Sequence, residues 1–201
     1  MSEKLIFKPV STLAEARALF PLIKEIWEEV FIPICGEETI DCMLKTWQNP
    51  HNIIKEIENG AAYFSILCSN VISEELPQTL SHKIRSSSEP TNATETKTIG
   101  YLAYELWKEP KNTTNALFIS KFYLKKEFRG NGFSHQMFNF FENSAKENNK
   151  KKLHLHVNRK NYIAIEVYKK HGFKIIKSID YPFPFAEGIF LYDHWMEKEL
   201  P

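Results

Sequence analysis

Apolar residues at the start of the chain follow first a strand pattern and then the spacing of a helix. Residues 4–10 form a short strand-like run, and residues 11–32 predict a helix that Ser11 or Thr12 can cap. Pro21 is expected to kink or split this helix, because proline lacks the N–H that a helix interior uses. The apolar positions at helical spacing are Leu13, Ala16, Leu19, Phe20, Ile23, Ile26, Trp27 and Val30.

Two short helices and a strand are predicted before a polar segment. Residues 36–47 and 52–60 carry apolar faces at helical spacing, and residues 61–68 predict a strand. Residues 69–97 are rich in Ser, Thr and Glu and poor in aromatic residues, which is typical of a flexible insertion. Apolar residues repeat every four positions in this stretch, so a short packed helix stays open as the alternative.

Strands and helices alternate in the remainder of the chain. Turn residues separate two strand patterns at 98–107 and 115–124, so we expect an antiparallel hairpin. The elements that follow are a helix at about 132–148, a strand at 151–157, a helix at 161–173, and strands at 174–180 and 188–197. This order predicts a mixed α/β fold with one central sheet and helices on its faces. We expect a single domain over residues 1–201, with a polar insertion at about 69–97.

Composition excludes some classes of protein. The chain has 201 residues and a net charge of +1, which argues against a nucleic-acid binder that works by bulk charge. No apolar run approaches the roughly 18 residues that a membrane span needs, and no signal peptide is visible. The three cysteines form no close pair, so we expect a reduced, cytoplasmic protein with neither a membrane nor a nucleic-acid partner.

The segment EFRGNGFSHQMF, residues 127–138, places two glycines directly before a helical pattern. The first N–H groups of a helix have no partner inside it and carry a partial positive charge. Glycines let the backbone approach a phosphate closely, so Arg129, Gly130 and Gly132 fit an anion-binding loop. A tight turn before a helix explains the same residues, and the motif alone favours that turn.

A second group of residues shares one face of the helix at 161–173. Asn161, Ala164, Ile165 and Tyr168 are spaced so that they lie along one stripe. A polar pair on an otherwise apolar face needs hydrogen-bond partners if it is buried. The alternative is an asparagine that starts the helix and a tyrosine that fills the core.

Together these segments resemble the GNAT family of N-acetyltransferases. FYLKKEFRGNGFS is similar to that family's acetyl-CoA-binding motif, Arg/Gln-x-x-Gly-x-Gly/Ala after a strand, with Ser134 where Gly or Ala is usual. VNRKNYIAIEVYKKHGF is similar to the second motif, and YDHWMEKEL resembles the last strand. The resemblance covers residues 98–198 well and residues 5–68 through element order only. EEVFIPICGEETIDCML carries a looser likeness to the polyamine (spermidine/spermine) branch.

The resemblance implies an acyl-CoA N-acyltransferase fold, with a mostly antiparallel sheet of about seven strands. It also implies acetyl transfer from acetyl-CoA to a primary amine by direct attack. The pyrophosphate would lie on the N–H groups that start the helix, and the pantetheine arm would lie along the preceding strand. The cofactor-binding residues would be Phe122, Tyr123, Leu124, Arg129, Gly130, Asn131, Gly132, Phe133, Ser134, His135, Asn161 and Tyr168.

The same resemblance assigns catalytic roles. The Leu124 N–H would stabilise the oxyanion of the tetrahedral intermediate, provided that the neighbouring strands separate at a bulge. Tyr168 would be the general acid; full proton transfer from a phenol to the thiolate is uphill by about 2 kcal/mol, so hydrogen-bond donation is the expected role. Asn161 would orient the cofactor or the acceptor. No base is identified, and the acids considered are Glu28, Glu29, Glu37, Glu38, Asp41 and Glu105.

Other interpretations stay open. A non-catalytic acyl-CoA-binding regulatory module would also explain the motifs, the Ser134 departure and the missing base. His154 and His156 share a strand face, but no Cys or acidic residue completes a metal-ligand spacing, so no metal is expected. The acceptor is open between a polyamine, another small amine and a protein N-terminus. A homodimer through the edge strands of the last hairpin is open as well.

Overall fold

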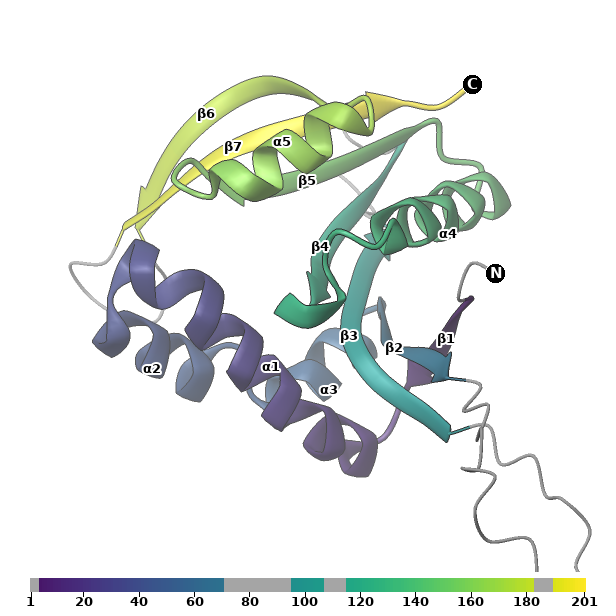
Figure 1. The fold of residues 1–201 in the computed structure, drawn as a ribbon. Helices are drawn as coiled ribbons and strands as arrows, with labels where there is room; N and C mark the ends of the chain where they lie inside the picture. The colour runs from purple at the N-terminus through teal and green to yellow at the C-terminus, as the bar shows by residue number, and fades with distance from the viewer. Residues whose placement is uncertain (1–3, 71–94, 107–114, 183–189) are drawn as a thin grey trace, which may run out of the picture.

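The computed structural model describes residues 4–70, 95–106, 115–182 and 190–201. Within these ranges the chain forms one seven-stranded sheet with helices on both faces (Figure 1), which confirms the mixed α/β class. The strands are β1 (Leu5–Val10), β2 (Ala61–Asn70), β3 (Glu95–Leu106), β4 (Ala116–Leu124), β5 (Lys152–Asn158), β6 (Lys174–Pro182) and β7 (Phe190–Glu199). The helices are α1 (Leu13–Cys35), α2 (Glu37–Thr46), α3 (Pro50–Glu58), α4 (Phe133–Glu147) and α5 (Tyr162–Lys170), with a 3-10 turn η1 (Lys126–Phe128) after β4.

The sheet is antiparallel except at one position. The strand order is β1-β2-β3-β4-β5-β7-β6, and only β4 and β5 run parallel among these neighbours. Parallel neighbours need a crossover connection, and α4 forms it between these two strands. The expected mostly antiparallel sheet of seven strands is therefore confirmed.

Helix α1 begins with a capping box and is not split by its proline. The Thr12 side chain accepts a hydrogen bond from the Glu15 N–H, and the Glu15 carboxylate accepts one from the Thr12 N–H. The helix continues through Pro21, so the alternative of a split there is wrong. Leu19 and Ile23, on either side of the proline, are buried in the same cluster, and this packing maintains the helix where one backbone bond is lost.

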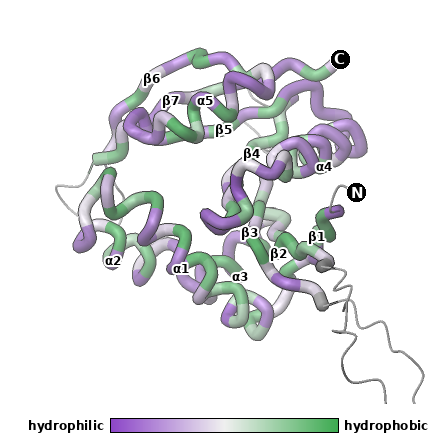
Figure 2. The backbone as a smooth tube through the Cα atoms, viewed as in Figure 1, coloured by the Kyte–Doolittle hydropathy of each residue, from purple (hydrophilic) through white to green (hydrophobic). Residues whose placement is uncertain are grey.

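Two hydrophobic clusters lie on opposite faces of the sheet. Along β3, Leu102 belongs to the cluster under α4 and α5, whereas Tyr101 and Ala103 belong to the cluster under α1, α2 and α3. This alternation follows from the two-residue period of a strand. Figure 2 shows hydrophobic positions along α1 and the central strands, and hydrophilic positions in the loop after β4. That loop is therefore built for solvent or for a polar ligand rather than for the core.

The predicted insertion is shorter than expected. Asn70 pairs with Glu95, so β2 and β3 extend into both ends of the stretch assigned to it. Residues 71–94 lie outside the described residues, and so does the choice between a loop and a short helix. The turn of the β3–β4 hairpin, residues 107–114, lies outside them too, although its two strands pair antiparallel as expected.

Strand β4 separates from β5 halfway along its length. The β4–β5 ladder ends at the pair Ile119 and Leu155. In the β3–β4 ladder the register shifts by one residue at Ser120, which has no partner on β3. An extra residue of this kind is a β-bulge, and it bends the strand that carries it. From Ser120 to Leu124 the edge of β4 that faces β5 thus has no strand partner in the described part of the chain, and Figure 1 shows the two strands diverging.

We expect Gly100→Ala to destabilise the protein and disturb the end of β4. A Cβ at Gly100 would lie 2.3 Å from the Tyr123 carbonyl oxygen and 2.7 Å from the Leu124 Cδ2. Overpacking of this kind costs about 2 kcal/mol, which lowers the melting temperature by about 4 to 8 °C in a chain of this length. Thermal unfolding measures the change, with Thr96→Ala at the exposed start of β3 as the control. An unchanged melting temperature for Gly100→Ala would contradict the close approach of β3 and β4.

Candidate active site

The loop between β4 and α4 presents unpaired backbone N–H groups. Gly130 has a φ of 82° and Gly132 a φ of 77°, and a Cβ built at either glycine meets no atom within 4 Å. Among the described residues, no acceptor is recorded for the N–H groups from Gly130 to Ser134. The His135 N–H donates to the Gly132 carbonyl at 3.0 Å, so it is not among the free donors, contrary to expectation. The open loop with its free donors fits an anion better than a tight turn alone does.

Arg129 connects this loop to β4 and to α1. Its Nε donates to the Leu124 carbonyl at 2.9 Å, and its two terminal nitrogens contact the two carboxylate oxygens of Glu29 at 3.0 and 2.5 Å. Arg129 is thus held by protein groups, and its expected contact with the cofactor stays a prediction. The bidentate pair and the carbonyl bond hold the loop against the end of β4.

Ser134 contacts a histidine instead of solvent. Its Oγ lies 3.3 Å from the His171 Nε2, and the His171 ring packs edge-on against His135 at 4.8 Å between ring centroids. His171 is the C-terminal cap residue of α5. The hydroxyl that replaces the family's small residue therefore links the start of α4 to the end of α5.

Alternate residues of β4 face the opening between β4 and β5. The Lys125 N–H donates to the Ile99 carbonyl of β3 at 2.8 Å. Because successive residues of a strand direct their N–H groups to opposite edges, the N–H groups of Phe122 and Leu124 point away from β3, toward the side that β5 has left. The backbone of Tyr123 faces β3 for the same reason. Two of the three predicted β4 residues thus offer a backbone contact to a ligand there.

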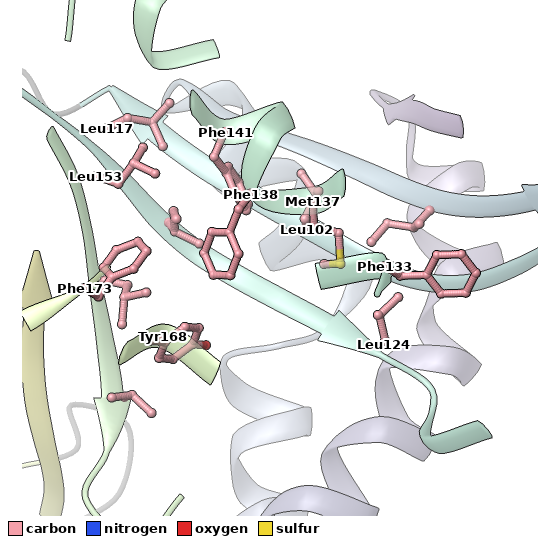
Figure 3. Close-up of a cluster of buried hydrophobic side chains, with 14 of the residues drawn as sticks. Leu102, Leu117, Leu124, Phe133, Met137, Phe138, Phe141, Leu153, Tyr168 and Phe173 are labelled. Carbon is pink, nitrogen blue, oxygen red and sulfur yellow. The ribbon is translucent and has the colours of Figure 1, made fainter. Parts of the chain in front are cut away.

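Tyr168 lies beside this opening with a phenol oxygen that has no hydrogen-bond partner among the described residues. Its ring packs edge-on against Phe122 at 5.8 Å and contacts Phe138 at 6.2 Å and Phe173 at 6.0 Å between centroids. Figure 3 shows the oxygen directed away from Phe173, toward the end of β4. Burial raises the pKa of Tyr168 well above its ordinary value. The phenol therefore stays protonated and is available as a donor.

Asn161 caps α5 rather than extending its face. Its Oδ1 accepts a hydrogen bond from the Ala164 N–H at 3.2 Å. The residue precedes the first turn of the helix, so it does not lie on the helical stripe with Tyr168 that the spacing suggested. Its part in orienting a cofactor or an acceptor stays a prediction.

The two strand histidines contact each other and an acid. His154 Nε2 lies 3.0 Å from His156 Nε2, and His154 Nδ1 lies 3.2 Å from Glu197. Burial and the neighbouring His154 lower the pKa of His156 to about 3. In the part of the chain that the structure describes, no group of three or more His, Cys, Asp or Glu is arranged to hold a metal ion.

Three of the six acids considered as bases form ion pairs. Glu28 pairs with Lys24, Asp41 pairs with Lys45, and Glu29 binds Arg129. Sequence reasoning missed the buried acid on β7, Asp193, which is 9% exposed. The signal was present, because the alternation of Leu191 and Asp193 along the last strand places both on one face.

Asp193 lies close along β7 to Leu191 and Tyr192, which line a pocket near the end of α1. The Tyr181 hydroxyl donates to the Asp193 Oδ2 at 2.7 Å. Burial raises the pKa of the Asp193 carboxyl above its ordinary value, while the Tyr181 bond and the charges of Arg159 and His194 act in the opposite direction. The pocket has a volume of about 180 Å³ and is lined by Ile34, Cys35, Thr39, Asn158, Lys160, Phe190, Leu191 and Tyr192.

Comparison with known proteins agrees with this geometry. The sequence model of the acetyltransferase (GNAT) family matches residues 69–173, which is half of the chain. The chain belongs to the GNAT acetyltransferase family. As a GNAT acetyltransferase it is an acyltransferase, as the motifs predicted. A search of curated proteins found no match.

Solved structures share the GNAT fold over nearly the whole chain. The PaiA N-acetyltransferase from Thermoplasma acidophilum, solved in complex with coenzyme A, has a TM-score of 0.67 at 16% identity, covering 98% of this chain and 99% of its own. The putative acetyltransferase yncA from Salmonella typhimurium, solved with acetyl-CoA, has a TM-score of 0.58 at 12% identity, covering 100% and 95%. A spermidine N-acetyltransferase SpeG chimera from Vibrio cholerae has a TM-score of 0.51 at 15% identity, covering 97% and 94%. At these identities the likeness shows the fold alone.

The described helices of this GNAT protein contain no segment that is both long enough and apolar enough to cross a membrane. The three cysteines, Cys35, Cys42 and Cys68, are free thiols.

We expect Gly132→Ala to weaken acetyl-CoA binding in this acetyltransferase beyond its effect on stability. An alanine at this left-handed φ costs about 1 kcal/mol, and its methyl group would occupy the open space at the loop. The expected loss of acetyl-CoA affinity is about tenfold, or about 1.4 kcal/mol, measured by titration calorimetry. Gly60→Ala is the matched control, because Gly60 has a φ of 100° with nothing within 4 Å and lies between α3 and β2. Equal affinity in both variants would exclude the loop as the phosphate site.

Proposed function

We propose that this GNAT protein transfers the acetyl group of acetyl-CoA to a primary amine by direct attack, through a tetrahedral intermediate. The observation that carries the proposal is the open edge of β4, which ends at Leu124 and whose Phe122 packs against Tyr168, a phenol without a hydrogen-bond partner among the described residues. A donor from the backbone and a donor from a side chain thus flank the same opening. This combination is suited to an acyl transfer in which charge develops first on oxygen and then on sulfur.

The binding of acetyl-CoA is supported at two places. The free N–H groups from Gly130 to Ser134 are suited to the pyrophosphate, because oriented backbone donors at a helix start attract anions. The edge of β4 at Phe122 is suited to the pantetheine arm, because the amides of that arm can pair with the unpaired backbone donors and acceptors of the strand. Arg129 is proposed to hold the loop in place through Glu29 and Leu124, and it contributes charge only if that ion pair opens.

The residues of the opening have distinct proposed roles. The Leu124 N–H donates to the carbonyl oxygen of the thioester as it becomes an oxyanion. The amine nitrogen forms the new C–N bond, and the C–S bond breaks as the intermediate collapses. Tyr168 donates a hydrogen bond to the leaving sulfur; its raised pKa makes complete proton transfer unfavourable, so donation rather than full transfer is its role.

The acceptor is proposed to be a small primary amine. One structure with this fold is titled a spermidine N-acetyltransferase, which supports an amine acceptor without selecting a polyamine. A protein N-terminus is the other acceptor that the chemistry permits. The alternative of a regulatory acyl-CoA-binding module predicts tight acetyl-CoA binding with no transfer to any amine.

We expect Tyr168→Phe to lower turnover about 100-fold and to leave the dissociation constant for acetyl-CoA within about twofold. The phenyl ring keeps the contacts with Phe122 and Phe138, so only the donor is lost. Release of CoA is measured against amines from spermidine to N-terminal peptides. Tyr162→Phe, an exposed tyrosine of the same helix, is the control.

Two results would decide against this function. Unchanged turnover in Tyr168→Phe would remove Tyr168 from the chemistry. Intact acetyl-CoA binding with no release of CoA for any amine would favour the regulatory module.

A further inference from the structure

We propose that Asp193, held by Tyr181, binds the ammonium group of the acceptor and takes its proton, and that the adjoining pocket holds the apolar remainder of a primary monoamine. This inference rests on the proposed function and names the base and the substrate class of that same site. It uses the only acidic side chain that is buried among the described residues.

The position of Asp193 in the sheet favours this role. It pairs with Asn158 at the end of β5, three residues beyond Leu155, where β5 last contacts β4. Asp193 therefore lies one strand behind β5, the strand that forms the far wall of the opening. The Leu124 N–H lies on the near wall, on β4, so an acceptor that contacts Asp193 would approach the thioester from across the gap.

Asp193 faces the α1 side of the sheet, whereas the face with α4 and α5 carries the glycine loop. Leu191, two residues before it on the same strand face, is buried in the cluster formed with α1, α2 and α3, and Tyr181 packs against that cluster. The acceptor and the cofactor would thus enter from opposite sides of the sheet. With the two substrates entering from opposite sides, the amine lone pair can be directed at the carbonyl carbon without displacing the cofactor.

Several groups around Asp193 interact electrostatically with its carboxyl. Tyr181 on β6, Arg159 after β5 and His194 on β7 act on the carboxyl itself. Tyr123 on β4 has its pKa raised by burial and then by Tyr168 and Asp193, so it interacts electrostatically with both the proposed acid and the proposed base.

Cys35, at the end of α1, also interacts electrostatically with Asp193. Burial raises the pKa of its thiol, and the charges of Lys160 and Asp193 act on it in opposite directions. Cys35 and Lys160 also line the pocket, so Asp193 and the pocket belong to one region. The carboxylate thus lies two residues along the same face of β7 from Leu191, which lines the pocket.

The pocket favours a monoamine over a polyamine. Its described lining is largely apolar, from Ile34, Phe190 and Leu191, and its one charged side chain is the cationic Lys160. A second ammonium group would meet this positive charge and find no carboxylate on the described lining. An aliphatic or aromatic body with a single amine fits both the lining and the charge.

The proton balance is complete without a further reactant. The Asp193 carboxylate takes one proton from R–NH₃⁺, and the neutral amine attacks the thioester carbon. After the C–N bond has formed, the thiolate departs with the C–S electron pair and takes up the second N–H proton, and the proton on Asp193 returns to solvent after product release. A carboxyl with a raised pKa is a stronger base than an ordinary one, although it remains weaker than the amine.

Binding is measured first, with Asp193→Asn as the variant. Asparagine keeps an acceptor for the Tyr181 hydroxyl and removes the charge. The probes are phenethylamine, its neutral analogue 2-phenylethanol, and spermidine, each titrated calorimetrically into the complex with CoA. We expect phenethylamine to bind the wild-type complex at least tenfold more tightly than either other probe, and to lose this advantage in Asp193→Asn. Equal binding of phenethylamine by wild type and variant, or tighter binding of spermidine by wild type, would overturn the proposal.

Kinetics then test the proton. We expect Asp193→Asn to lower kcat/KM about 100-fold at pH 7, with acetyl-CoA affinity unchanged. The deficit should shrink near pH 10, about the pKa of an alkyl ammonium, because the free amine then no longer needs a base. A deficit that is the same at both pH values would assign Asp193 to binding alone and overturn its role as the base.

Tyr181→Phe supplies an independent readout. The Tyr181 bond lowers the pKa of Asp193, so its loss should move the ascending limb of the kcat/KM profile to higher pH. An unmoved limb would contradict the assignment of that limb to Asp193.

The control is Asp180→Asn, the same substitution at an exposed acid one residue from Tyr181, which pairs with Arg159. It should preserve binding and rate, and all variants should melt near the wild-type temperature. If the wild-type protein transfers acetyl to no amine yet binds phenethylamine through Asp193, the proposed function fails while the amine site stands. If transfer occurs and Asp193→Asn retains the wild-type rate and binding, the proposed function stands while the amine site at Asp193 fails.

Discussion

The structure depends on the separation of β4 from β5. Seven strands form one sheet, but the ladder between these two ends at Ile119 and Leu155, directly before the bulged residue Ser120. Unpaired backbone donors and acceptors within a fold are costly unless water or a ligand satisfies them. The bulge therefore produces an edge whose hydrogen-bonding capacity is available to a substrate, and it does so in the middle of a sheet that is otherwise paired.

The rest of the site follows from that separation. Because β5 diverges, α5 lies over the gap, and Tyr168 reaches toward the end of β4 from one face of the sheet. The loop after β4 then begins α4 with its donors exposed, and the pairing of Arg129 with Glu29 connects this loop to α1 on the other face. Asp193 lies one strand further on, paired with Asn158 at the end of β5. Segments that are distant in sequence are thus brought together around one opening.

The parts of this arrangement that local patterns encode were predictable from the sequence. Helical and strand periodicities gave the order of the elements, and the loop around Gly130 and Gly132 was located by its glycines. Contacts between distant segments were not predictable. The bulge at Ser120 changes pairing by one residue without breaking the local pattern of β4, and the partner of Arg129 lies 100 residues away in α1. Asp193 was overlooked because an isolated acid in an alternating strand is ordinarily exposed, whereas the fold buries this one.

Burial raises the pKa of both Tyr168 and Asp193, but the chemical consequences for the two groups are opposite. It raises the pKa of Tyr168, which keeps that group protonated, so that it remains a donor throughout the working range of pH. It also raises the pKa of Asp193, which makes the anion a better proton acceptor, while the Tyr181 bond acts in the opposite direction. A raised carboxyl pKa lowers the stability of the fold as the pH rises from the ordinary value of the group through the raised one, since the ionised form is the one that burial penalises. Retention of a buried acid at this cost is therefore better explained by a requirement for its charge at the opening than by a contribution to folding.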